Sequence, residues 1–175
     1  MHLKFCLAIV SMLILGAAGA PAQTQNGDPA DGFYNLTKAA PRAFNAGEYD
    51  NAAALANQLL AEAEPWKTNW NYGNAIHAAN LVLGRIALAK GETEDARKFL
   101  LAAGKTPGSP QLKTFGPDML FATEMLKKGE SKSVLEYFAL CAKFWKPKDD
   151  RLEVWKASVE RGEIPDFGPN VRYFF

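Results

Sequence analysis

Apolar residues recur every three or four positions along most of this chain, and no stretch shows the strict alternation of a β-strand. The pattern is clearest over residues 76–107, where two apolar stripes follow each other. Gly91 separates them, and glycine ends a helix in a left-handed turn without steric penalty. Glu92, Glu94 and Asp95 then bring negative charge to the first turn of the second helix, where the helix dipole favours it. The stretch is predicted to be a helical hairpin with the stripes Ile76, Ala79, Leu83, Ile86 and Ala87, then Ala96, Phe99, Leu100 and Ala103.

Residues 33–65 show the same organisation and predict a first hairpin, with residues 45–50 as its turn. Pro41 falls inside the first predicted helix, where proline removes a backbone hydrogen bond and crowds the preceding turn. We therefore expect this helix either to kink at Pro41 or to start late, close to it. The second helix of the pair has a regular stripe formed by Ala52, Ala53, Ala56, Leu59 and Leu60.

Residues 118–146 predict a third hairpin, with Ser131 as the N-cap of its second helix and Pro147 as its end. Cys141 falls on this second helix, and we expect its thiol to be buried and slow to react, since an apolar setting raises the pKa of a thiol. Leu152, Trp155 and Val159 indicate one more helix. The aromatic stretch from Asp166 to Phe175 has no regular pattern and is expected to dock on the last helices.

A Gly-Glu pair follows a helical stripe at residues 47, 91, 129 and 162, at spacings of 44, 38 and 33 residues. The first three pairs also precede a stripe, so the pairs are in phase with the helices. A single hairpin cannot bury its apolar face, and stacked neighbours are needed to do so. The predicted fold class is all-α, with three stacked hairpins and a C-terminal helix.

The central hairpin resembles a tetratricopeptide repeat (TPR). The residues that carry the resemblance are Leu83-Gly84, Gly91, Ala96, Leu100, Ala103 and Pro107, in the order and spacing of that family. Asn80 and Ala87 depart from it, because the family usually has Trp and Tyr at these places. The resemblance implies a right-handed solenoid of about three TPR-like hairpins over residues 33–175, whose concave face holds a peptide or a partner protein.

The family's register implies which side chains line that concave face. It places Arg85 and Lys127 near one another, where the pair would hold a carboxylate such as a peptide C-terminus. The alternative is that both are solvated charges and that the chain's own Tyr173, Phe174 and Phe175 fill the groove. The residues that the register brings to this face are Tyr34, Thr37, Phe44, Leu81, Arg85, Leu88, Met119, Thr123, Leu126 and Lys127.

Two connectors interrupt the helical pattern. Residues 66–74 hold Trp66, Trp70, Tyr72 and three asparagines, and are either a binding loop or a connector whose tryptophans cap a helix pair. Residues 105–118 are rich in Pro and Gly and form the second connector. The Gly104-Lys105-Thr106 sequence within this region is not a phosphate-binding loop, since a helix rather than a strand precedes it and Phe99 stands where the motif needs glycine.

The N-terminus has the pattern of an export signal. Lys4 supplies positive charge, Phe5–Leu15 is an apolar run too short to span a membrane, and small residues follow up to Ala22. We expect cleavage after Ala22 and a periplasmic or secreted bacterial protein, with an uncleaved anchor as the alternative. Residues 23–32 are polar and are predicted to be a disordered leader.

Removal of residues 1–22 takes away Lys4, one of the 20 Lys and Arg, and none of the 19 Asp and Glu, so the charges balance. This balance argues against nucleic acid and anionic membrane surfaces as partners. Cys141 and His77 are the only Cys and His that remain, so we expect no disulfide, no metal centre and no cofactor.

A catalytic role is not expected from this sequence. His77 would need a nucleophile such as Ser109 or Ser131, and no motif places either beside it. The expected function is that of an exported binding module with no remaining membrane span. Its candidate contacts are Tyr34, Trp70, Tyr72, His77, Leu81, Arg85, Met119, Thr123 and Lys127. The alternative is a structural or assembly subunit of a cell-envelope complex.

Overall fold

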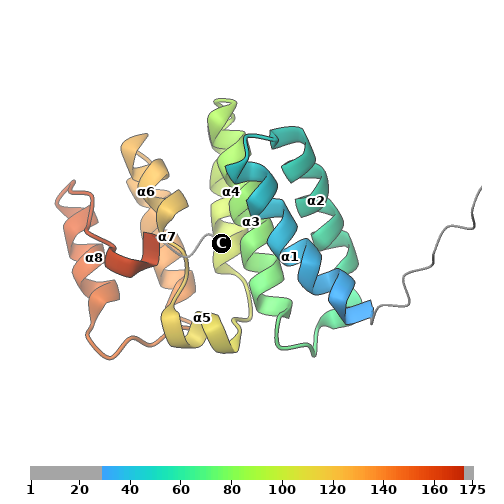
Figure 1. Cartoon of the computed structure of the whole chain (residues 1–175). Coiled ribbons are helices and arrows are strands. Elements are labelled where there is room, and N and C mark those ends of the chain that lie inside the picture. Colours follow the sequence, from blue (N-terminus) through green and yellow to red (C-terminus); the bar gives the residue numbers. More distant parts are fainter. Residues whose placement is uncertain (1–28, 172–175) are drawn as a thin grey trace, which may run out of the picture.

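The computed structural model describes residues 29–171, and these contain helices and no strand, which confirms the all-α prediction. Figure 1 shows the helices side by side in a row. Residues 1–28 and 172–175 lie outside the described part, and with them the predicted signal peptide and Tyr173–Phe175. The elements are α1 (Pro29–Asn45), α2 (Tyr49–Glu62), η1 (Glu64–Trp66), α3 (Tyr72–Ala89), α4 (Thr93–Gly104), α5 (Pro110–Phe115), α6 (Leu120–Lys127), α7 (Ser131–Cys141), α8 (Arg151–Glu160) and η2 (Gly168–Val171).

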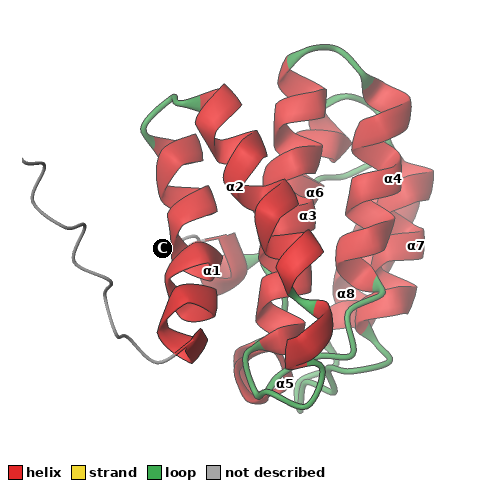
Figure 2. Cartoon of the chain, turned by 90° about the vertical axis from the view of Figure 1, so that its right-hand side faces the viewer, coloured by secondary structure: helices red, strands yellow, loops and turns green. Residues whose placement is uncertain are grey.

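Three pairs of consecutive helices form the body of the molecule. The pairs are α1 with α2, α3 with α4, and α6 with α7, and each pair is joined by a short turn. Helices α1 and α2 both pack on α3, α4 packs on α7, α3 touches α6, and α8 packs on α7. Helix α5 lies beneath the row, at the lower ends of the other helices, in both views (Figures 1 and 2). Neighbouring pairs therefore contact each other along the chain, with α5 inserted between the second and the third.

The four Gly-Glu turns share one backbone conformation. Their glycines have φ between 80° and 83°, the left-handed region in which other residues are strained. In every turn the glycine N–H donates to the carbonyl three residues before it, and the glutamate N–H donates to the carbonyl five residues before its own position. This is the Schellman motif, and it satisfies carbonyls at the helix end. The four glycines are Gly47, Gly91, Gly129 and Gly162.

Helix α1 begins earlier than predicted. It begins at Pro29, so residues 29–32 belong to the helix and not to the predicted leader. Asp31 lies in its first turn, where a negative charge stabilises the helix dipole. The helix also runs through Pro41, and the predicted late start is wrong. The Pro41 side chain is fully buried, so its packing offsets the backbone hydrogen bond that proline removes.

Helices α5 and α7 differ from the sequence-based predictions. The second connector contains α5, whose N-cap is Ser109: the Ser109 Oγ accepts from the Leu112 N–H at 2.9 Å, with Pro110 as the first helical residue. Helix α7 begins at Ser131 itself, after Glu130, so Ser131 is not the N-cap. This helix ends at Cys141, before the predicted end near Pro147.

The core consists of two clusters that meet around the second hairpin. One cluster lies among α1, α2 and α3, and the other extends from α3 and α4 to α8 and Phe167. Phe99 packs against both. At Gly84 a Cβ atom would collide with the rings of Phe121 and the Cβ of Phe99, so glycine lets α3 approach α4 and α6 closely. Cys141 lies inside the second cluster, as predicted.

The described part of the C-terminal stretch docks on the last helices. Phe167 packs edge-on against Phe138 and Trp155, with ring centroids 6.0 and 5.0 Å apart. Asn170 is fully buried, and its Nδ2 donates to the carbonyls of Phe115 and Pro117, each at 3.0 Å. The segment therefore ties the end of the chain to the link between α5 and α6. No helix in residues 29–171 has the length and hydrophobicity to cross a membrane.

Candidate binding site

Hydrogen bonds from amide side chains fix the connector that leads into α3. The Asn69 Nδ2 donates to the Tyr34 hydroxyl at 3.0 Å, and the Asn69 Oδ1 accepts from the Asn71 N–H at 2.8 Å. The Asn71 Nδ2 donates to the Thr37 Oγ1 at 3.0 Å. Tyr34 and Thr37 lie one helical turn apart on α1, so the connector is attached to that helix at two successive points.

The same polar network continues to the start of α5. The Asn74 Nδ2 donates to the Asn71 Oδ1 at 3.0 Å, and it also bonds the Gln111 Oε1. The Ser109 Oγ donates to the Asn74 Oδ1 at 2.6 Å. Gly73 lies so close to the Gly108 carbonyl that any Cβ would collide with it. The start of α3 is therefore bonded to α1 on one side and to α5 on the other, and these bonds fix the connector in position.

The aromatic side chains of this connector differ sharply in exposure. Trp66 stacks on Phe33, with ring centroids 5.3 Å apart and planes 11° apart, and it supports the core. Tyr72 is half-buried against the same cluster. Trp70 is 50% exposed, and its ring lies 5.5 Å from that of Tyr34 at an angle of 33°. Tyr34, Asn69 and Trp70 thus form a surface that we call the aromatic edge.

Arg85 already holds a carboxylate of this chain. Its Nε and Nη2 donate to the two carboxylate oxygens of Glu124 at 2.9 and 2.7 Å, which is a bidentate ion pair between α3 and α6. Its guanidinium carbon lies 4.3 Å from the centre of the Phe44 ring on α1. Lys127 is exposed at the end of α6. The sequence predicts that Arg85 and Lys127 together bind the carboxylate of a ligand. In the structure, Arg85 binds the carboxylate of Glu124.

Three other candidates lie within or against the core. Leu81 and Met119 have no exposed surface, so they pack inside the second cluster and are not available to a ligand on the surface. The Met119 N–H donates to the Asn170 carbonyl at 2.8 Å, which shows that η2 covers this position. Thr123 is partly buried, and its hydroxyl donates to the Met119 carbonyl at 3.0 Å. We leave these three residues out of the site.

His77 is buried, and both of its ring nitrogens have partners. The Nδ1 lies 3.1 Å from the Ala103 carbonyl, and the Nε2 accepts from the Asp118 N–H at 3.4 Å. Burial lowers the pKa of His77 to about 4, against the opposing effect of the Ala103 bond. The ring is therefore neutral, carries its proton on Nδ1 and joins α3 to two later segments. It is a structural residue with no atom available to a ligand.

Asp118 is a buried carboxyl group that no sequence pattern indicates. Its Oδ1 accepts from the Leu120 N–H at 2.6 Å, and its carbonyl accepts from the Tyr137 hydroxyl at 3.1 Å. Within residues 29–171 its Oδ2 is buried without a hydrogen-bond partner. Burial raises the pKa of Asp118 to about 7, although the Leu120 bond and the positive charge of Arg85 act in the opposite direction.

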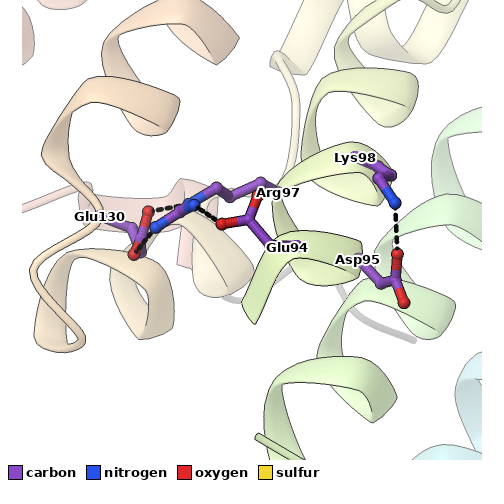
Figure 3. A network of polar contacts seen from close by, with 5 residues as sticks. All are labelled: Glu94, Asp95, Arg97, Lys98 and Glu130. Atoms are coloured by element: carbon purple, nitrogen blue, oxygen red, sulfur yellow. Dashed lines mark hydrogen bonds and ion pairs between the residues drawn. The ribbon is translucent and has the colours of Figure 1, made fainter. Parts of the chain in front are cut away.

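A cleft of about 590 Å³ lies between α4 and the start of α7. Arg97 crosses it and bonds both oxygens of Glu130 as well as Glu94 on its own helix, and the Lys98 Nζ lies 2.7 Å from the Asp95 Oδ1 nearby (Figure 3). Three basic side chains (Arg97, Lys98 and Lys132) and three acidic ones (Glu94, Glu130 and Glu136) line the cleft, so their charges balance and the cleft attracts no particular ionic ligand. Its ion pairs link the second hairpin to the third.

The described residues contain no group of three or more His, Cys, Asp or Glu side chains arranged to hold a metal ion. Comparisons of the chain with protein-family models, with curated proteins and with solved structures gave no match. The candidate site therefore rests on the geometry of this chain alone, and the aromatic edge is the part of it that combines exposure with rigidity.

Proposed function

We propose that this chain is an exported helical-repeat module that binds a partner protein or peptide, with Trp70 as its main contact. The observation that carries this proposal is a half-exposed tryptophan on a connector that amide hydrogen bonds fix to α1. Tryptophan and tyrosine are enriched among the residues that dominate interface energies, since they bury large areas. A side chain that is already held in place loses little entropy on binding, which raises affinity.

Two features support stacking of the hairpins as TPR-like repeats. The turns between the helices of each pair have the same Schellman geometry, as expected of repeated units. The family's register brings Phe44 and Arg85 to one face, and the two side chains are in contact in the structure. In the proposed arrangement α1, α3 and α6 line the concave face, and the aromatic edge lies where α1 meets the connector into α3.

The proposal includes export to the periplasm or the outside of a bacterial cell. Its support is the N-terminal sequence, with Lys4, the apolar run Phe5–Leu15 and the small residues that end at Ala22. The partner would then be a protein of the cell envelope or of the surroundings. An assembly subunit of an envelope complex and a transient binding module share this location, and they differ in how long the partner stays bound.

Photo-cross-linking in the producing cells tests the proposal. A photoreactive phenylalanine replaces Trp70 in one variant and Val154 in the other, which is 60% exposed on α8 and serves as the matched control. We expect position 70 to yield a discrete adduct that position 154 does not. An adduct at both positions or at neither would contradict the proposal. A partner that stays bound without cross-linking in 1 M salt would identify an assembly subunit instead.

A further inference from the structure

The aromatic edge presents free hydrogen-bond donors, and its side-chain oxygens already accept one hydrogen bond each. The Trp70 indole N–H has no partner among the residues that the structure describes, and half of its side chain is exposed. The Tyr34 oxygen accepts from Asn69, which leaves the hydroxyl hydrogen to donate elsewhere. The amide oxygens of Asn69 and Asn74 already accept from the Asn71 N–H and the Ser109 hydroxyl.

The connector carries one ion pair beside this surface. Lys67, three residues before Trp70, is paired with Glu64, and this bond raises the pKa of the Lys67 ammonium. The aromatic edge itself consists of two aromatic rings and an amide, with no charged side chain. A strongly acidic or strongly basic ligand would find no complementary charge here, so the surface fits an uncharged partner with apolar faces and exposed acceptors.

Proline-rich segments have this chemistry. An ordinary extended peptide brings one N–H for each residue and needs acceptors for them, whereas proline brings only a carbonyl. Addition of a peptide to a sheet edge requires a strand, and residues 29–171 contain none. A polyproline II helix has no internal hydrogen bonds and keeps all its carbonyls exposed, and it is already ordered before it binds.

We infer that the segment received by the aromatic edge is a proline-rich peptide in the polyproline II conformation. This inference rests on the proposed function and gives the chemical class of the partner. The ring centroids of Tyr34 and Trp70 are 5.5 Å apart. The polyproline II helix has three residues per turn and rises about 3.1 Å per residue, so residues on one of its faces recur only about every 9 Å. The two rings are therefore close enough to contact one proline ring together, and the indole N–H would donate to a neighbouring carbonyl of the peptide.

The test is a titration of the full exported chain with labelled decaproline, with a Gly-Ser peptide of the same length as the reference ligand. We expect decaproline to bind and the Gly-Ser peptide not to. Trp70→Ala should weaken decaproline binding at least about tenfold. Tyr34→Phe should weaken it at least about threefold, since the bond to the peptide and the bond that the hydroxyl accepts from Asn69 are both lost. Val154→Ala should leave it unchanged. Circular dichroism of each variant checks that the helical fold is retained.

Other outcomes overturn the inference and leave the proposed function to its own test. Equal binding of both peptides, or decaproline binding that survives Trp70→Ala, would show that the aromatic edge does not recognise proline. Failure of decaproline to bind while position 70 still forms its adduct in cells would mean a partner of another chemistry. Trp70-dependent binding of an N-acetylglucosamine oligomer, with no binding of decaproline, would replace the peptide by a glycan.

Discussion

Two buried groups at one junction, His77 and Asp118, respond to pH in opposite directions. Folding lowers the pKa of His77 from 6.5 to about 4, so stability is lost as the pH falls through this range and the unfolded chain takes up the proton first. Folding raises the pKa of Asp118 from 3.8 to about 7, so the folded chain keeps a proton that the unfolded chain has released. Because of Asp118, the folded chain therefore loses stability as the pH rises. Between about pH 4 and 6.5 the contributions of Asp118 and His77 to the stability offset each other.

Single substitutions should separate these two effects. Relative to Asp118→Asn, the unsubstituted chain should lose stability as the pH rises from about 4 to 7. Relative to His77→Gln, the unsubstituted chain should gain stability as the pH rises from about 4 to 6.5. Each difference has an upper limit of about 1.4 kcal/mol per pH unit, the value for one proton. Urea unfolding at several pH values measures both. A pH-independent difference for either variant would show that this group does not titrate in the range given.

At the scale of elements, Ser109 and Ser131 lie at the starts of two helices and can be compared. Ser109 caps α5 through its bond to the Leu112 N–H and also donates to Asn74, whereas Ser131 lies inside the first turn of α7. We expect Ser109→Ala to lower the free energy of unfolding by about 0.5 to 2 kcal/mol, the range for loss of an N-cap. Ser131→Ala should change it by less than about 0.5 kcal/mol. Thermal or urea unfolding compares them, and equal effects would refute the assignment of the N-cap.

Most elements were predictable from sequence because their signals are local. The 3.6-residue stripe and the Gly-Glu pair mark both helices of a hairpin and the turn between them. Helix α5 has only six residues, too few to show a stripe, although Ser109-Pro110 is the start signal that identifies it. The sequence left open whether α1 passes Pro41 or starts close to it, because the outcome depends on the packing of the proline ring, which is fully buried.

The binding residues were harder to predict, because burial depends on neighbouring hairpins. Leu81 and Trp70 were equal candidates in the sequence, but one is fully buried and the other half-exposed. Nothing in the sequence around Asp118 indicates that its carboxyl is enclosed by α3, α6 and α7. The aromatic residues and asparagines of residues 66–74 predict either a binding loop or a connector, and the structure divides its tryptophans into one packed against the core and one on the surface.

At the scale of the whole molecule, ion pairs join the second hairpin to the third at two places. Arg85 bonds Glu124 between α3 and α6, and Arg97 bonds Glu130 between α4 and the start of α7. The Arg85 and Glu124 side chains are only 12% and 30% exposed, so water screens them less than an ion pair on the surface. The relative position of the two hairpins should therefore depend more on Arg85 than on the exposed pairs.

A double-mutant cycle tests this expectation. We expect Arg85→Ala and Glu124→Ala to show a coupling free energy of about 1 to 2 kcal/mol, since the pair is bidentate and partly buried. The cycle subtracts the other contacts of Arg85, including that with Phe44. The control cycle uses Lys98 and Asp95, whose side chains are 74% and 52% exposed, and its coupling should lie within experimental error. Equal couplings in the two cycles would contradict a special role for Arg85.

The burial of Cys141 has a consequence for the redox behaviour of the chain. It is the only cysteine among the described residues, it has no exposed surface, and burial raises the pKa of its thiol above the ordinary value. Attack on a disulfide requires an accessible thiolate, and here the thiolate is both inaccessible and scarce. An oxidising compartment therefore acts on this thiol only while the chain is unfolded. In the folded state Cys141 neither adds stability under oxidising conditions nor exchanges disulfides with neighbours, and packing alone protects its sulfur.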